Sequence, residues 1–184
     1  MSNGNLVPAT AFSAYYVPNP AGSLPLSELV IGGQSYTPNG QQWNTSFFWL
    51  VVVDLTDLSV VASEVSSDGS TVPADIAQYA GNPQYFLYAI SNSAWASVMP
   101  QGNLYALLQK AGSGDKLARL EQIYAQIGTG FLGTFSYILG ATMTEGDEPG
   151  FETLSMDNLT LLTMAFLPVT VNGQTIYAPI QQGS

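Results

Sequence analysis

The chain has 184 residues, which suits one folded domain, and 46% of them are hydrophobic. Only 9% are charged, against a typical ~25%, and thirteen acids against three bases leave a net charge of −10. Residues 1–109 contain no base, which argues against nucleic acid and anionic membranes as partners. The absence of histidine and cysteine excludes disulfides, serine–histidine relays and the usual zinc and haem sites.

Charge divides the sequence into three zones. Residues 1–42 are rich in Pro, Gly, Ser and Tyr and contain one charged residue, Glu28, and residues 158–184 contain none. We predict an N-terminal β arm over 1–42, an α/β core domain over 43–157 and a C-terminal β arm over 158–184. Within the first arm, a turn at Gly32-Gly33 between two short apolar–polar segments predicts a hairpin over residues 30–37.

The core zone begins with strands. Residues 47–53 form a continuous apolar run that ends in three valines, which is typical of a strand buried on both faces. A turn at 54–57 leads to a second predicted strand near 58–65. Thr71 is placed to cap a short helix with Pro73 in its first turn, which Gly81 ends. Residues 85–90 predict the next buried strand.

Two helices and a strand follow. Leucines 104, 107 and 108 repeat at helical spacing up to Gly112, and a second apolar repeat runs from Leu117 to Gly128. Residues 135–139 predict another strand, which gives the order ββαβααβ. We therefore expect a single α/β (α+β) domain with a mixed sheet, short helices packed on it, and β-hairpin arms at both ends.

The last predicted element is a hairpin over residues 170–177. Its Asn172-Gly173 pair suits the left-handed turn that such a hairpin needs. The segment has the same form as residues 30–38: an apolar stretch, a glycine turn, a glutamine, a tyrosine and then a proline. Coincidence among turn-rich strands and a pair of related β arms are both open interpretations.

Two short motifs match known cofactor-binding or catalytic patterns but lack the flanking elements that those patterns require. Gly128-Thr-Gly-Phe-Leu-Gly133 matches the dinucleotide fingerprint, yet a predicted helix enters it and a strand leaves it, the reverse of the working order. Ser113-Gly-Asp-Lys116 matches S-x-x-K without the companion S-D-N and K-T-G motifs, so Ser113 or Asp115 more simply caps the next helix. We expect no catalytic residue and no cofactor.

The densest acidic cluster supplies the weak candidates for a metal site: Glu145, Asp147, Glu148 and Glu152. Loop carboxylates suit hard cations such as Ca²⁺, but the EF-hand spacing is absent, so we expect a solvated loop and no bound metal. A carboxylate pair could also serve glycoside hydrolysis, which depends on spatial separation and stays an open third hypothesis. The three bases, Lys110, Lys116 and Arg119, are interpreted as a solvated helix face rather than an anion site.

The core zone resembles the domain of the interleukin-like epithelial–mesenchymal transition inducers and pancreatic-derived factor, over about residues 44–155. The resembling segments are Leu50–Asp54 with Leu58–Glu64, Gln84–Ser91, Gly128–Phe131, Phe135–Gly140 and Gly150–Glu152. The resemblance implies a non-catalytic, lectin-like or protein-binding module and transfers no catalytic residue. Animal members carry disulfides, so a cysteine-free chain favours a microbial or viral relative.

The preferred functional hypothesis is a structural subunit of a particle or appendage, such as a phage virion component. Uncharged apolar strands are hazards in a monomer and need cover, which the core, a neighbouring subunit or a protein partner can supply. The contact residues that we expect are Tyr36, Leu161, Phe166, Ile176 and Tyr177.

The alternative is a carbohydrate-binding module that uses the aromatic faces of Tyr15, Tyr16, Tyr36, Trp43, Trp95 and Tyr177. The N-terminus lacks the basic start and apolar stretch of a secretory signal. We expect a product made in the cytoplasm, without a membrane partner, and compatible with a virion or a released particle.

Overall fold

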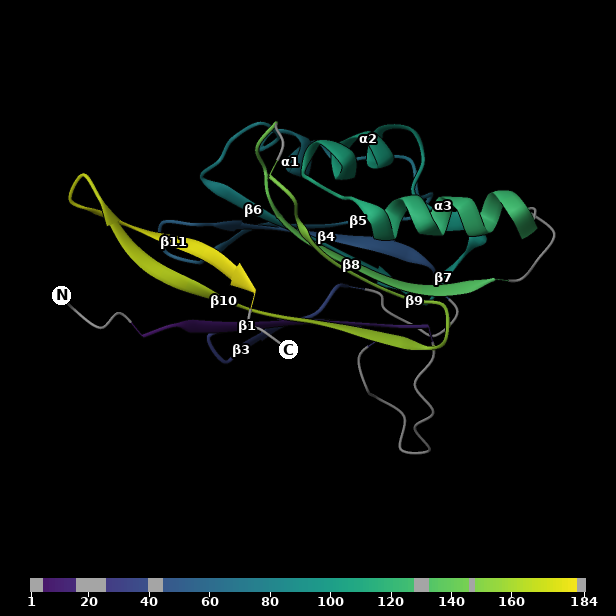
Figure 1. Cartoon of the computed structure of the whole chain (residues 1–184), viewed down its shortest axis with the longest axis horizontal. Helices are drawn as coiled ribbons and strands as arrows, with labels where there is room; N and C mark the ends of the chain where they lie inside the picture. Colours follow the sequence, from purple (N-terminus) through teal and green to yellow (C-terminus); the bar gives the residue numbers. More distant parts are fainter. Residues whose placement is uncertain (1–4, 16–25, 40–44, 128–132, 146–147, 182–184) are drawn as a thin grey trace.

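The computed structural model describes residues 5–15, 26–39, 45–127, 133–145 and 148–181. Figure 1 shows three stacked layers: one β-sheet, a second β-sheet and a layer of short helices. The predicted class, a single α+β domain with short helices on a sheet and hairpins toward both ends, is confirmed. No helix among the described residues has the length and apolar character to cross a membrane.

The middle layer, here named the core sheet, is formed by residues 47–155. It has the order β5-β4-β6-β8, with β7 and β9 also paired to β8. Its strands are β4 (Phe47–Asp54), β5 (Val60–Ser66), β6 (Tyr85–Asn92), β7 (Ala94–Trp95), β8 (Thr134–Thr142) and β9 (Phe151–Ser155).

The outer layer, here named the flank sheet, combines the two end regions of the sequence in the order β11-β10-β1-β2-β3. Strand β1 pairs with β10 from Val7↔Phe166 to Ala14↔Leu159, so the early and late parts of the chain share one sheet. The strands are β1 (Val7–Ala14), β2 (Ser27–Ile31), β3 (Gln34–Tyr36), β10 (Leu159–Val171) and β11 (Gln174–Gln181).

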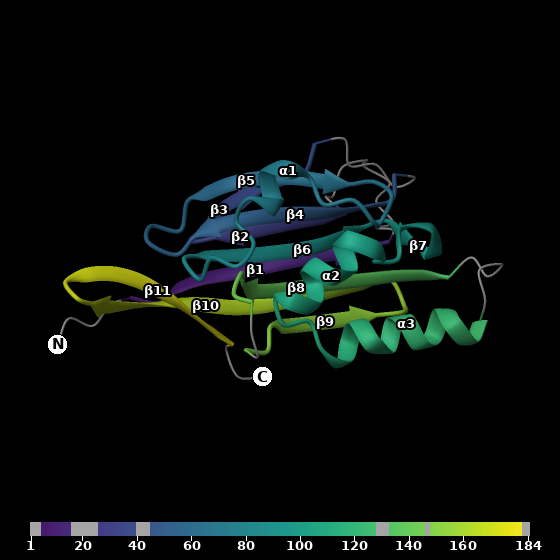
Figure 2. The same ribbon diagram turned by 90° about the horizontal axis from the view of Figure 1, so that it is seen from above.

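The helices cover the face of the core sheet opposite to the flank sheet (Figures 1 and 2). They are α1 (Ala74–Ala77), the 3₁₀ turn η1 (Ala96–Val98), α2 (Gly102–Lys110) and α3 (Asp115–Ile127). This arrangement explains the apolar run in β4. Phe48, Leu50 and Val52 pack toward the helices, and the alternate residues pack against the flank sheet.

Both hairpin predictions are confirmed. Gly32 and Gly33 adopt φ values of 58° and 89° between β2 and β3. Asn172 and Gly173 adopt 50° and 82° between β10 and β11, the left-handed pair that a tight hairpin turn requires. The strands near 47–53, 58–65, 85–90 and 135–139 and the three helices also form where the sequence places them.

One part of the architecture differs from expectation. Every strand pairing among the described residues is antiparallel, so the sheets are not mixed. The two predicted arms pair with each other and place Leu162, Met164 and Phe166 against the core sheet. Much of the cover that these apolar strands need is therefore found within the same chain.

Neither Thr71 nor Ser113 caps the helix that follows it, and Asp115, the other candidate for α3, lies in the first turn of that helix. Thr71 makes no capping bond to α1, because its hydroxyl donates to Asp68 at 2.7 Å. With the backbone N–H groups of Thr71 and Ser70, this bond lowers the pKa of Asp68. The Ser113 hydroxyl makes no bond within the described structure. The carboxylate of Glu152 accepts the N–H groups of Gly114 and Lys116 instead, at 2.9 and 3.2 Å, and so caps α3 from strand β9.

Candidate interaction surface

The flank sheet has two faces of different character. Its inner face packs Ala9 and Ala11 of β1 and Leu162, Met164 and Phe166 of β10 into the core between the sheets. Because side chains alternate along a strand, the residues between these positions point away from the core. This outer face contains Phe12, Val30, Leu159, Leu161, Thr163 and Leu167, with Phe12 directly opposite both Leu161 and Glu28. It is the lower side of the flank sheet in Figure 1.

Exposed apolar side chains concentrate on this sheet. Eight large hydrophobic residues are exposed among the described residues, and four of them, Leu159, Leu161, Leu167 and Val171, lie on β10. Leu161 is the most exposed, at 51%. Leu6 and Met156 immediately precede β1 and the turn into β10, and the remaining two, Val61 and Val65, lie on β5. A concentration of this kind marks an interaction surface in soluble proteins.

The outer face is also nearly free of charge. Glu28 is the single charged residue in the five strands of the flank sheet. Its carboxylate accepts a hydrogen bond from the Ser35 hydroxyl on the neighbouring strand β3. The other acids and all three bases lie outside these strands. The molecule therefore presents one weakly charged apolar face and carries its net negative charge elsewhere.

The five predicted contact residues are not equivalent. Leu161 lies on the outer face and is exposed. Phe166 is fully buried between the sheets, where its ring meets Phe86 edge-on at 5.5 Å, so it is a core residue and cannot contact a second molecule. Tyr36, Ile176 and Tyr177 are partly buried against the same core.

A buried polar network fixes the flank sheet on the core sheet. The Ser13 hydroxyl of β1 donates to the Ser91 carbonyl of β6 at 2.6 Å, and the two hydroxyls lie 2.8 Å apart. The Ser91 hydroxyl in turn accepts the backbone N–H of Tyr137 at 2.8 Å. A second contact joins the Ser27 hydroxyl to Asn92 at 2.8 Å. These bonds tie β1 and β2 of the flank sheet to β6 and β8 of the core sheet.

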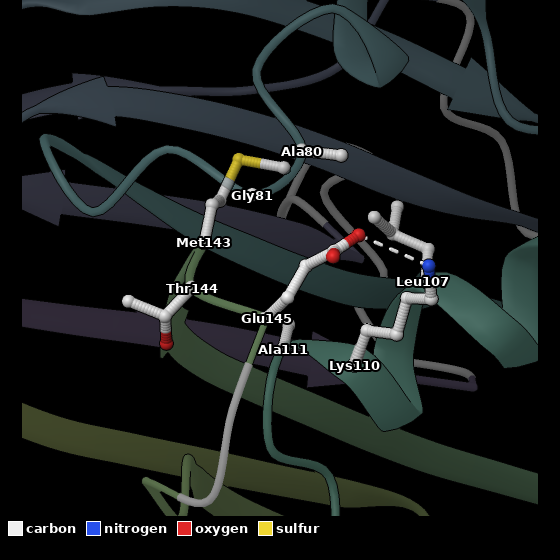
Figure 3. A pocket seen from close by; sticks show the side chains of 8 residues that line it. All are labelled: Ala80, Gly81, Leu107, Lys110, Ala111, Met143, Thr144 and Glu145. Carbon is white, nitrogen blue, oxygen red and sulfur yellow. Dashed lines mark hydrogen bonds and ion pairs between the residues drawn. The ribbon is translucent and has the colours of Figure 1, made fainter.

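The described residues of the acidic cluster have separate contacts near the junction of α2 and α3. Glu145 forms an ion pair with Lys110 at 3.0 Å, and both side chains are more than 60% exposed. Figure 3 shows this pair beside a shallow depression that α2, the segment after β8 and Ala80-Gly81 line. Glu148 is exposed, and Asp147 lies outside the described residues. Within the described parts of the chain, no three acidic side chains gather closely enough to hold a metal ion.

Glu152 has a structural role that sequence reasoning missed. Besides capping α3, it accepts the hydroxyl of Tyr137 at 2.6 Å. Burial and the neighbouring carboxylate raise the pKa of Tyr137 well above its ordinary value. The residue joins α3, β8 and β9, and its bonding partners are more than ten positions away in the sequence, so no local pattern could reveal them.

The remaining motif residues stay separate. Lys116 and Arg119 are exposed on α3, and Lys110 ends α2. The glycine motif at 128–133 lies outside the described residues except for Gly133, whose carbonyl accepts the Tyr124 hydroxyl at 2.7 Å.

The aromatic residues proposed for glycan binding are also dispersed. Tyr15 and Trp95 meet with their ring centroids 5.8 Å apart and are half-buried. Tyr36 and Tyr177 pack partly against the core, and Tyr16 and Trp43 fall outside the described residues.

Comparison with known proteins finds no family model and no curated protein that matches this chain. The resemblance of residues 44–155 to the interleukin-like inducer domain stays a prediction.

Proposed function

We propose that this chain is a non-catalytic assembly subunit that binds another protein surface through the outer face of its flank sheet. A place in a particle or appendage, such as a virion or a released particle, fits this proposal. One observation carries it: the flank sheet exposes Leu159, Leu161 and Leu167 on a face that has one charged residue. Exposed apolar side chains without neighbouring charges lower the desolvation cost of association.

The composition and the bonds made by two carboxylates favour a binding role over catalysis. Histidine and cysteine are absent from the sequence. In the described structure, Glu145 forms an ion pair with Lys110. Glu152 accepts hydrogen bonds from the Tyr137 hydroxyl and from a backbone N–H group at the start of α3. These bonds give both carboxylates a structural role, which supports binding over hydrolysis.

Light scattering of the unmodified chain, coupled to size-exclusion chromatography over a wide concentration range, tests the proposal. We expect a mass above the 19.5 kDa of one chain, with reversible dissociation on dilution. A mass of one chain at every concentration, together with no binding to any candidate particle component, would remove the proposed function.

A carbohydrate-binding module is the second candidate, and the Tyr15–Trp95 pair is the observation that favours it. Half-buried aromatic rings at the end of a strand can stack on sugar rings. Titration calorimetry against a panel of sugars, with Trp95→Ala as the matched variant, tests this candidate. Heat that is lost in the variant would support it, and the same absence of heat for both proteins would exclude it.

A further inference from the structure

We infer that the partner of the outer face is a second copy of this chain, and that the two flank sheets stack face to face in a closed dimer. The inference rests on the proposed function and specifies its partner and geometry. Three observations lead to it: the distribution of charge, the twist of the sheet and the state of the strand edges.

Charge limits how two copies can approach. Each copy has a net charge of −10, which opposes association at most surfaces. The flank sheet is the exception, because its five strands contain only Glu28. Contact between two outer faces therefore brings two carboxylates near each other, and each already accepts a hydrogen bond from Ser35 of its own chain. Contact through the helical layer would instead bring many acids together.

Sheet geometry favours an identical partner. Two sheets stack well only when their twists match, with their strands nearly aligned and a separation of ~10 Å. The inner face of the flank sheet already packs face to face on the core sheet. The flank sheet of a second copy has the same twist because the two chains are identical. Across a two-fold axis, both copies use the same surface patch, which includes Leu161.

The edge strands of both sheets are obstructed. This disfavours an assembly in which further copies add their strands to these edges. Strand β5 has a bulge at the point where the register shifts between Val52 and Val53, and it carries the exposed Glu64. Strand β3 has three residues. Strand β11 donates its Tyr177 N–H to the Leu55 carbonyl at 2.8 Å and contains Pro179, which has no N–H. Strand β9 lies against α3, whose first turn binds Glu152.

The obstructed edges, together with an outer face on which the described residues leave Leu159, Leu161 and Leu167 exposed, predict a closed dimer rather than a fibre. A face-to-face contact across a two-fold axis uses the same patch on both copies and leaves no free patch for a third. Strand addition at open edges would continue without limit.

Two matched variants test the inference. Leu161→Glu places a charge on the outer face, and Val65→Glu makes the same kind of change at an exposed apolar strand residue outside the flank sheet. We expect Leu161→Glu to weaken dimerisation at least tenfold in sedimentation equilibrium and Val65→Glu to leave the dissociation constant unchanged. Circular dichroism and thermal melting of both variants establish that they fold, and Thr163→Lys provides a second charge on the outer face. Truncation before β10 is unsuitable, because Leu162, Met164 and Phe166 belong to the core.

Cross-linking gives an independent measurement, because the natural chain has no cysteine. A Thr163→Cys variant treated with a bismaleimide that spans the ~10 Å between stacked sheets should give a covalent dimer. A Val65→Cys variant should stay monomeric under the same treatment.

The outcomes separate the two proposals. Association that survives both Leu161→Glu and Thr163→Lys, or that produces open-ended fibres, overturns the face-to-face dimer and leaves the assembly function standing. Binding only to a different protein has the same consequence. An unassociated chain with no partner at any concentration overturns both.

Discussion

At the scale of single residues, the buried serines hold the two sheets in one relative position. Ser91 is fully buried, and its hydroxyl accepts the N–H of Tyr137 at 2.8 Å. In Ser91→Ala this N–H loses its acceptor inside the protein, so we expect the free energy of unfolding to fall by ~1–3 kcal/mol. Urea denaturation measures the change, with the exposed Ser97→Ala as the control. Equal stability of the two variants would show that the network contributes nothing.

Buried tyrosines make the fold sensitive to alkaline pH. Burial raises the pKa of Tyr124 to about 12, and it also raises the pKa values of Tyr88 and Tyr137 well above their ordinary value. The unfolded pKa of tyrosine is ~10, so above that pH the folded chain holds protons that the unfolded chain releases. Stability is therefore complete below pH ~10 and is lost as pH rises through the higher folded values.

We expect the loss to approach ~1.4 kcal/mol per pH unit for each buried tyrosine. Urea unfolding at a series of pH values, followed with tyrosinate absorbance, measures it. Tyr88→Phe keeps the buried ring and should remove part of the pH dependence. Stability that stays constant above pH ~10, or complete ionisation of all tyrosines near that pH while the protein is folded, would disprove the expectation.

At the scale of elements, strand β10 has two faces with separate roles. Phe166 is buried against Phe86, whereas Leu161 is 51% exposed on the opposite face. We expect Phe166→Ala to lower the free energy of unfolding by ~3–5 kcal/mol, because it opens a cavity between the sheets. Leu161→Ala should change it by less than ~0.5 kcal/mol when measured at protein concentrations low enough to populate the monomer. Similar losses for both variants would mean that the two faces are not distinct.

Local signals sufficed to predict most elements. The strand at 47–53 and the turn at Asn172-Gly173 can each be predicted from a few adjacent residues. A continuous apolar run indicates a buried strand, and an Asn-Gly pair indicates a left-handed turn. The fold class followed from the order of these elements.

The pairing of β1 with β10 could not be predicted, because the partners are about 150 positions apart and no local pattern sets their register. The sequence of β10 also lacks strict alternation: Leu161 and Leu162 are adjacent, yet the first is exposed and the second is buried. Phe166 was therefore expected at a contact although it belongs to the core. The cap of α3 by Glu152 depends on a contact across 36–38 positions for the same reason.

At the scale of the whole molecule, a face with one charged residue and a net charge of −10 predict how association responds to salt. Repulsion between two acidic copies acts over the Debye length, which falls from ~30 Å at 0.01 M to ~8 Å at 0.15 M ionic strength. We therefore expect the dissociation constant to decrease several-fold over this range in sedimentation experiments. A dissociation constant that increases with salt would indicate a contact built on ion pairs, which the outer face does not contain.

The most direct test of the outer face as the contact surface is hydroxyl-radical footprinting of the unmodified chain, below and above the concentration at which it associates. Phe12, Leu159 and Leu161 should lose reactivity on association, while the exposed Val61 and Val65 keep theirs. Unchanged reactivity of Leu159 and Leu161 in the associated protein would contradict the contact that we infer.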